Sequence, residues 1–234
     1  MTKNPKLALI GYGKMGRMLD RLASEYGFDV CARRDVDRPE PLEGADVAIE
    51  FSTPQAVVGN VELVTSLRIP MVVGTTGWLD EIDEVQRIVR KNEANLVWSP
   101  NFSIGVNVFQ RLIEEAATLL ANEPGYGAWA WEIHHDTKKD APSGTLIQLV
   151  EAMKTAGYRR SIDISSNRAG AHPGTHEIGF DSAADTITLR HTARSREGFA
   201  RGALKAAQWI VHRNSLGERG FFNFTDVLFG ATRG

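Results

Sequence analysis

Hydrophobic and polar positions follow two different patterns along the chain, and the first extends to residue 99. Continuous apolar runs there predict strands buried on both faces, at 6–10, 28–32, 46–51, 70–74 and 95–99. Stretches with helical spacing separate them, at 15–26, 55–67 and 79–91. This alternation of strand and helix predicts a parallel sheet with right-handed crossovers and helices on both of its faces.

The second pattern begins after residue 101. Helical spacing predicts a long amphipathic helix at 105–121 and another helix at 198–212. Strict alternation, rich in Thr and Ile, predicts half-exposed strands at 127–133, 161–166, 174–180 and 185–193. Such strands favour an open, mixed or mostly antiparallel sheet with helices on one face, in a second domain of the α+β class.

Composition and charge exclude several classes of protein. Hydrophobic residues make up 42% and charged residues 24% of the 234 residues, as expected for a globular protein with a packed core. Twenty-seven basic and 29 acidic side chains leave a net charge of −2, so we expect neither nucleic acid nor a membrane as partner. The single cysteine, Cys31, excludes an internal disulfide. We expect a cytoplasmic protein, because no signal-peptide pattern is present and no run approaches the ~20 apolar residues of a membrane span.

A glycine-rich loop follows the first predicted strand and opens the first helix. Its sequence, G-Y-G-K-M-G at residues 11–16, is the pattern G-x-G-x-x-G in its proper context. The glycines allow a tight turn, close approach of a pyrophosphate and close packing of the helix, whose first amides bind the anion. The loop predicts a Rossmann-type, doubly wound dinucleotide-binding domain, and a glycine turn without a ligand is the alternative. The expected cofactor contacts are Gly11, Tyr12, Gly13, Lys14, Met15 and Gly16.

The end of the second strand bears on the choice of cofactor. In NAD-binding domains an acidic residue near this point holds the ribose hydroxyls. Here Arg33 and Arg34 occupy it, and guanidinium groups suit a ribose 2′-phosphate, which favours NADPH over NADH. Asp35 or Asp37 could still serve NADH, and two arginines on a solvated strand edge are the alternative without a ligand.

Two further loops belong to the same expected edge of the sheet. Open α/β sheets bind ligands at the carboxyl ends of their strands. Small residues with free amides follow the fourth strand, and another turn follows the fifth. From these loops we add to the predicted cofactor contacts Gly74, Thr75, Thr76, Ser99, Pro100, Asn101 and Phe102.

The stretch EIHHDTKKDAPSGT, residues 132–145, joins a strand end to a helix start. Alternation puts Glu132 and His134 on one face of the strand, and His135 on the other face or in the loop. A histidine carries protons near neutral pH, and Lys138 adds a positive charge. The pattern therefore predicts proton transfer beside a cationic loop.

The helix that follows begins at an end that can bind an anion. Asp140 or Ser143 is the expected cap, and Gly144 and Thr145 then present backbone amides in the first turn. A proton carrier, an ammonium group and a helix start within this short stretch suit a substrate with carboxylates.

Metal binding and nucleophilic catalysis are the competing interpretations of this stretch. His134, His135 and Asp136 offer metal ligands, but adjacent histidines on a strand point apart and no third ligand has a recognisable spacing. We therefore predict no metal. Ser143 lacks the G-x-S-x-G pattern of a nucleophile and is better explained as a cap.

Taken together, these segments resemble the dihydrodipicolinate reductase family, the 4-hydroxy-tetrahydrodipicolinate reductases of bacterial and plant lysine and diaminopimelate synthesis. The resemblance spans nearly the whole chain. It rests on GYGKMG, GTTG, PNFSIGVNV and above all on the family pattern E-x-H-H-x-x-K-x-D-A-P-S-G-T, of which every fixed position is present. It implies a homotetramer that reduces a cyclic imine dicarboxylate with NADPH or NADH, by hydride transfer to ring C4 and protonation at C3.

The resemblance also implies roles for single residues. His134 is the acid/base residue and Lys138 is the proton donor. The residues that hold the substrate carboxylates are His135, Lys138, Gly144 and Thr145. Four assignments are weaker. Arg168 and His176 are expected beside the substrate, and Arg196 and Phe199 are expected near the cofactor.

The family's organisation implies a dinucleotide-binding domain of residues 1–101 plus 208–234 and a substrate-binding and oligomerisation domain of residues 102–207. The sequence departs from the family at Arg33, where many members have an acidic residue, and this leaves the cofactor preference open. Another two-domain NAD(P)-dependent dehydrogenase is one alternative, although it has no need of the histidine stretch. A non-catalytic NAD(P)-binding sensor is the other, although it has no need of His134 and Lys138.

Overall fold

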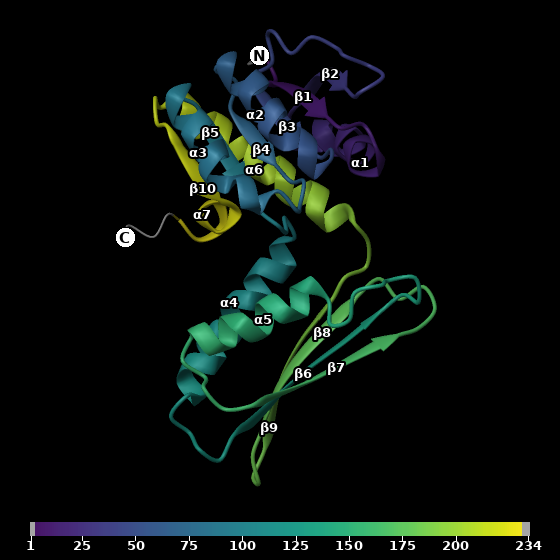
Figure 1. Ribbon diagram of the computed structural model, residues 1–234, viewed down its shortest axis with the longest axis vertical. Helices are drawn as coiled ribbons and strands as arrows, with labels where there is room; N and C mark the ends of the chain where they lie inside the picture. The colour runs from purple at the N-terminus through teal and green to yellow at the C-terminus, as the bar shows by residue number, and fades with distance from the viewer. Residues whose placement is uncertain (1–2, 231–234) are drawn as a thin grey trace. The chain divides into compact units, whose positions relative to one another are not determined.

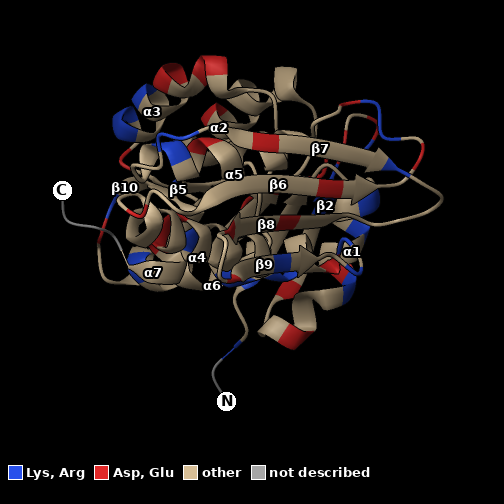
Figure 2. Cartoon of the chain, turned by 90° about the horizontal axis from the view of Figure 1, so that it is seen from below, with Lys and Arg blue, Asp and Glu red and all other residues tan. Residues whose placement is uncertain are grey.

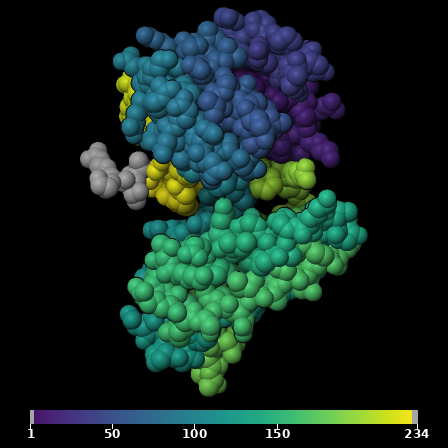
Figure 3. Space-filling view, in the orientation of Figure 1, coloured from purple at the N-terminus to yellow at the C-terminus, as the bar shows by residue number. Residues whose placement is uncertain are grey.

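The structure is a computed structural model that describes residues 3–230 (Figure 1). The chain forms two compact units: one contains the described residues up to Ile104 and those from Glu197 onward, and the other is Gly105–Arg196. The space-filling view shows the C-terminal segment, yellow, beside the blue residues of the first unit (Figure 3). The outermost residues of the expected dinucleotide-binding domain, 1–2 and 231–234, lie outside the described residues.

The first unit contains a six-stranded parallel sheet with the order β10-β5-β4-β3-β1-β2. Its strands are β1 (Lys6–Ile10), β2 (Asp29–Arg34), β3 (Val47–Glu50), β4 (Met71–Val73), β5 (Asn95–Trp98) and β10 (Gly220–Asn223). Every pairing in the sheet is parallel. This confirms the predicted doubly wound Rossmann-type sheet.

Helices cover both faces of this sheet, which explains the continuous apolar runs of its strands. They are α1 (Lys14–Leu22), α2 (Val57–Ser66), α3 (Ile82–Lys91), α6 (Glu197–Ser215) and α7 (Phe224–Phe229), with short 3₁₀ turns at Ala23–Tyr26, Pro54–Ala56 and Leu79–Glu81. In β1, Leu7 and Leu9 pack in a core shared with α1 and α6, whereas Ala8 and Ile10 pack in a core shared with α2 and α3.

Helix α6 explains where the chain divides. It is one continuous helix, and its small residues pack in the core of the first unit. A Cβ at Gly202 would lie 1.7 Å from the carbonyl oxygen of Phe102, so only glycine allows this approach. The boundary expected at 207/208 falls inside this helix, and the contacts divide the chain at 104/105 and 196/197 instead.

The second unit is a four-stranded mixed sheet with two helices on one face. Its strands are β6 (Gly127–His134), β7 (Ile162–Arg168), β8 (Thr175–Asp181) and β9 (Thr186–Thr192), in the order β7-β6-β8-β9. The β6–β7 pair is parallel, and the other two pairs are antiparallel. Helices α4 (Ile104–Leu120) and α5 (Gly144–Thr155) pack on one face, and Figure 2 shows the opposite face of the sheet in front. The predicted open mixed sheet is confirmed.

The sequence pattern missed two elements at the C-terminal end. No element was predicted after residue 212, but strand β10 pairs with β5 and forms the edge of the parallel sheet. Helix α7 follows it directly, capped by Asn223. Among the described residues, no helix is long and apolar enough to cross a membrane.

Candidate active site

The glycine-rich loop has the geometry that its sequence predicts. Gly11 adopts φ +86°, and a Cβ there would lie 2.0 Å from the carbonyl oxygen of Phe51. A Cβ at Gly16 would lie 2.2 Å from the carbonyl oxygen of Gly11. Around the Cβ position of Gly13, in contrast, there is no atom within 4 Å, and this residue is the N-cap of α1. The loop thus leaves open space in front of the first amides of the helix, where a pyrophosphate would bind.

Two cavities adjoin this loop at the carboxyl edge of the sheet. Gly13, Phe51 and Ser52 line both of them. The predicted cofactor residues that line one or both cavities are Gly11, Gly13, Lys14, Met15, Arg34, Gly74, Thr75 and Thr76. Tyr12 and Gly16 shape the loop without lining either cavity.

The two arginines at the end of β2 have different surroundings. Nε and Nη2 of Arg33 lie 2.7 and 2.8 Å from the carboxylate oxygens of Asp20, to which the Tyr12 hydroxyl also donates. Burial acts to raise the pKa of Asp20, but the hydrogen bonds from Arg33 and Tyr12 outweigh it and hold the pKa below its usual range. Arg34 lines a cavity, and its Nη1 donates to the carbonyl oxygen of Glu40 at 2.9 Å. Arg33 is therefore engaged inside the protein, and Arg34 is the arginine beside the cavity.

The residues of the loop after β5 make their contacts inside the protein. The Ser99 hydroxyl donates to the carbonyl oxygen of Asn101 at 2.9 Å, which closes a tight turn around Pro100. Phe102 is 2% exposed, and its ring centroid lies 4.8 Å from that of Phe224. The described linings of the two cavities contain none of Ser99, Pro100, Asn101 and Phe102.

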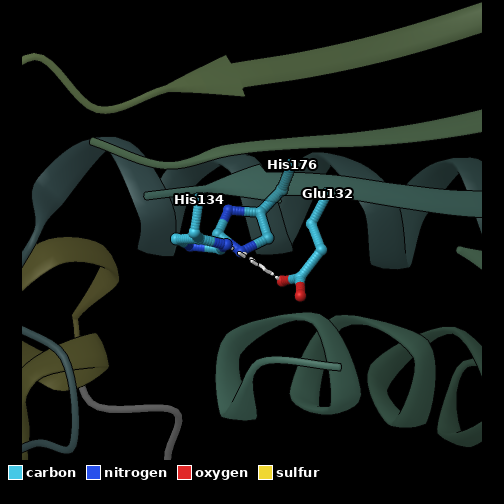
Figure 4. Close-up of side chains that lie close together, drawn as sticks. All are labelled: Glu132, His134 and His176. Carbon is cyan, nitrogen blue, oxygen red and sulfur yellow. Dashed lines mark ion pairs between the residues drawn. The ribbon is translucent and has the colours of Figure 1, made fainter. Parts of the chain in front are cut away.

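In the second unit, three strands bring charged and titratable side chains together on the inner face of the sheet. Glu132 and His134 share that face of β6, as alternation predicts. The register places His176 of β8 opposite Glu132, and Arg168 of β7 opposite His134. Figure 4 shows Glu132 and the two imidazole rings pointing toward one another.

Glu132 is the centre of this cluster. It is completely buried, and it accepts hydrogen bonds from the backbone N–H of Ser143 and from Nη2 of Arg168, both at 2.9 Å, and from the Ser143 hydroxyl. Burial acts to raise the pKa of Glu132, but the bonds from Ser143 and Arg168 outweigh it and hold the pKa below its usual range. Glu132 is therefore an ionised carboxylate whose charge is balanced by Arg168.

The two histidines lie next to this carboxylate. Nδ1 of His134 and Nε2 of His176 are each 3.5 Å from Oε2 of Glu132, and the ring centroids are 5.1 Å apart. Burial lowers the pKa of His134, although the charge of Glu132 acts against it. Burial, together with His134, lowers the pKa of His176 to about 4. Both imidazoles are thus neutral near pH 7, and Nδ1 of His134 is buried without a hydrogen-bond partner among the described atoms.

Gly174 makes room for the His134 ring. It adopts φ +131°, which L side chains rarely take, and a Cβ there would lie 2.9 Å from Nε2 of His134. The start of β8 therefore fixes where this imidazole can lie.

The loop between β6 and α5 carries the predicted cationic residue. Nζ of Lys138 lies 2.7 Å from Oδ1 of Asp140, and this hydrogen bond lowers the pKa of Asp140. Arg168 ties the same loop to the cluster, because its Nε donates to the carbonyl oxygen of Lys138 at 3.3 Å and its Nη2 to that of Asp140. Nδ1 of His135 lies 2.7 Å from the Thr137 hydroxyl, outside the buried cluster.

Ser143 decides how α5 begins. Its hydroxyl accepts from the backbone N–H of Leu146 at 3.2 Å, so Ser143 and not Asp140 is the cap. The same hydroxyl also donates to Glu132. Gly144 and Thr145 follow in the first turn, as predicted, and Gly144 is exposed.

The geometry also allows a metal to be considered. Ligand atoms of Glu132, His134 and His176 lie within 4.8 Å of one another, so β8 supplies the third ligand that the sequence did not reveal. However, Arg168 and Ser143 already bond to both carboxylate oxygens of Glu132. The guanidinium of Arg168 already balances the negative charge of Glu132 that would otherwise attract a metal. The arrangement is therefore better suited to proton transfer.

Comparisons with known proteins decide the family. The N-terminal part of the dihydrodipicolinate reductase family matches residues 5–102, and the C-terminal part matches residues 105–228. The chain belongs to the dihydrodipicolinate reductase family. Members of this family are NAD(P)H-dependent oxidoreductases of lysine and diaminopimelate biosynthesis, so the predicted resemblance and enzyme class are confirmed.

Similar members of this family come from several bacteria. The 4-hydroxy-tetrahydrodipicolinate reductase of Christiangramia forsetii is 35% identical, over 95% of this chain and 97% of its own length. That of Staphylococcus carnosus is 34% identical, over 95% of this chain and 99% of its own length. A dipicolinate-bound dihydrodipicolinate reductase from Paenisporosarcina sp. TG-14 has the same fold, with a TM-score of 0.76 at 20% identity over 95% of this chain and 98% of its own.

Sequence reasoning found part of the cluster and missed its centre. Alternation places Glu132 on the face of His134 without indicating a role for it, and the sequence indicates Ser143 only as a cap. Arg168 and His176 came only from the family resemblance. A signal for Glu132 was present, because a carboxylate at an inward position of a half-exposed strand requires a buried partner.

Proposed function

We propose that the chain reduces 4-hydroxy-tetrahydrodipicolinate, or dihydrodipicolinate, to tetrahydrodipicolinate. The 4-hydroxyl leaves as water to give the unsaturated ring of dihydrodipicolinate; a bound nicotinamide cofactor would supply a hydride to ring C4, and the electron pair released toward C3 would take up a proton. The observation that carries the proposal is the buried cluster around Glu132, which lies next to a cationic loop and a helix start in a member of this family.

His134 is the proposed acid/base residue. Its imidazole is neutral near pH 7, so it can take a proton and pass it on. The ionised Glu132, 3.5 Å from Nδ1, stabilises the protonated ring once it forms. A positioned acid or base of this kind accelerates a reaction by about 10²–10⁴.

The loop and helix start are the proposed binding site for the two substrate carboxylates. Gly144 and Thr145 offer amides at the N-terminus of α5, a helix of 12 residues. Lys138 is held by Asp140 and would exchange this carboxylate for that of the substrate, while also serving as proton donor. His135 lies at the start of the same loop and supplies a further contact.

The proposed cofactor is NADPH or NADH, with NADPH favoured by Arg34. This guanidinium lines the cavity beside the glycine loop, where it can bind a ribose 2′-phosphate. Arg33, paired with Asp20, is proposed to position the end of β2 and to contact the cofactor only indirectly. Asp35 lines the same cavity, and its carboxylate already accepts from the backbone N–H of Tyr12 at 2.8 Å.

The outer face of the four-stranded sheet supports the proposal of a homotetramer. Trp129 and Trp131 lie on this face of β6, with α4 and α5 packed on the other face. The Trp131 indole donates to Asn167 at 2.6 Å, and Arg190 lies over its ring. A sheet face that presents two partly exposed indoles is typical of contact with another subunit. Light scattering on the purified protein measures the size of the assembly, and a monomer would contradict the proposed homotetramer. The cytoplasmic location stays a prediction.

Turnover with both cofactors tests the proposed function. We expect NADPH and NADH to be oxidised with freshly made substrate, and His134→Gln and Lys138→Ala each to lower kcat by about 10²-fold or more. Lys139→Ala is the matched control, since Lys139 is an exposed neighbour and should leave kcat unchanged. Arg34→Ala should lower the ratio of NADPH to NADH turnover. Nucleotide binding without turnover would contradict the reductase proposal.

A further inference from the structure

Glu50 is a completely buried carboxyl group in the first unit, and the proposed mechanism gives it no role. It is the last residue of β3, a central strand, and its register partners are Ile10 of β1 and Val73 of β4. The other residues of β3 are apolar. A buried carboxyl at such a position costs free energy unless it has a function or a set of partners.

The hydrogen bonds of Glu50 are concentrated on one oxygen. Oε1 accepts from the backbone N–H of Ser52 and from the Thr75 hydroxyl, both at 3.0 Å, and from the Ser52 hydroxyl. Oε2 is buried and has no hydrogen-bond partner among the described atoms. The carboxyl therefore joins the loop after β3 to the loop after β4.

These partners belong to the walls of the two cavities. Ser52 lines both cavities, and Thr75 lines one of them. The backbone N–H of Ser52 also lies 2.7 Å from the Thr75 hydroxyl, and Nδ2 of Asn60, which lines the other cavity, donates to the Ser52 hydroxyl at 3.2 Å. Glu50 thus lies behind the wall that a dinucleotide would contact.

Among the residues that the structure describes, no cation pairs with this carboxyl. Burial raises the pKa of Glu50, and the hydrogen bonds from Ser52 and Thr75 do not offset it. The groups that face it come from the loop after β3, the loop after β4 and helix α2, and they are Ser52, Thr75 and Asn60. None of these side chains titrates in the accessible pH range. Glu50 therefore stays protonated to a higher pH than a glutamate on the surface does.

We propose that Glu50 is a positioning residue for the nicotinamide cofactor, which fixes Ser52 and Thr75 at the cavity wall without touching the reacting atoms. The inference rests on the proposed use of NADPH or NADH. If Glu50 ionises, a charge without a partner forms behind the wall, so cofactor affinity decreases as pH rises above the ordinary range for glutamate.

Cofactor titration in the absence of substrate tests this role. Glu50→Gln keeps an acceptor for Ser52 and Thr75 but cannot ionise, so it should bind NADPH within about threefold of wild type and with a flatter pH profile. Glu50→Ala removes the acceptor and should raise the Kd for NADPH by roughly tenfold or more. At saturating cofactor, kcat of Glu50→Gln should stay near that of wild type.

Asn95→Ala is the matched control for loss of stability. Asn95 is also completely buried, and its Nδ2 donates to the carbonyl oxygen of Glu218 at 2.7 Å and to Asn214 at 3.1 Å, at the start of β5. It should lower the melting temperature without raising the Kd for NADPH. If Glu50→Ala is too unstable to purify, the pH profile of Glu50→Gln decides the matter.

Two results overturn the inference about Glu50 alone. One is a Glu50→Ala protein that binds NADPH like wild type, and the other is a wild-type Kd whose pH profile matches that of Glu50→Gln. A wild-type protein that binds neither nucleotide would overturn the proposed cofactor as well.

Discussion

The two units each contain a completely buried glutamate, and the two carboxyl groups have opposite properties. Glu132 bonds to a guanidinium, and its pKa is lowered although burial acts to raise it. Glu50 accepts hydrogen bonds from the hydroxyls of Ser52 and Thr75 and from a backbone N–H, and burial raises its pKa. Neither side chain is exposed to solvent, and the pKa of Glu132 is lowered by its hydrogen bonds from Ser143 and from the guanidinium of Arg168.

This difference suits Glu132 and Glu50 to different roles. An ionised Glu132 can stabilise a protonated His134, which is useful where a proton is moved. Glu50 holds two loops, and its raised pKa makes it less ready than a surface glutamate to add a negative charge beside an anionic dinucleotide. The pairing with Arg168 is therefore the feature to disrupt first.

Removing the cation should have the largest effect. Arg168→Met leaves a buried charge on Glu132 without its partner, and we expect a loss of about 3–5 kcal/mol in the free energy of unfolding. Urea denaturation measures it. Arg87→Met is the control, since Arg87 pairs with Glu84 within α3 at 61% exposure and should change stability by less than about 1 kcal/mol.

A double variant sharpens this prediction. Glu132→Gln combined with Arg168→Met removes both charges and should recover much of the lost stability. Equal losses in the single and double variants would show that the packing of Arg168, and not its charge, is what matters.

The next effect is on catalysis. Glu132→Gln removes the charge that favours protonated His134, so we expect kcat to decrease by about 10²-fold, with an acid/base pKa shifted downward in the pH–rate profile. Glu177→Gln, a change on the neighbouring strand β8 but on the opposite face, should leave the profile unchanged. A lower kcat with no shift in the profile would argue for a purely structural role of Glu132.

The sequence predicts features that depend on neighbouring residues better than it predicts contacts between distant segments. The strand at 6–10 was predicted to the residue, because a run that is apolar on both faces has clear ends. Alternation also placed Glu132 beside His134. Both inferences use only neighbours in the chain.

The remaining contacts depend on the pairing of distant segments. Arg168 reaches Glu132 through the parallel register of β6 and β7, and His176 through the antiparallel register with β8. Strand β10 was not predicted, because a stretch of four residues gives little pattern of its own and forms a strand by pairing with β5. The bond between Arg33 and Asp20 could not be predicted from the sequence, because it requires α1 to lie against the end of β2. The local pattern of residues predicts helices and strands, but strand register and packing determine which distant side chains come into contact.

The smallest predicted effect is the pH dependence of stability, where the two acids should act in opposite directions. The pKa of Glu50 is raised in the folded state, so its contribution is complete below the unfolded pKa and is lost as pH rises through the folded pKa. The pKa of Glu132 is lowered, so its contribution is present above the unfolded pKa and is lost as pH falls through the folded pKa. Relative to wild type, Glu50→Gln should therefore gain stability with rising pH, by about 1 kcal/mol for each unit of pKa shift removed, and Glu132→Gln should gain it with falling pH. Melting curves from acid to neutral pH measure both slopes. Slopes of the same sign would mean that the two carboxyl groups titrate alike, and Arg168 would then not set the charge of Glu132.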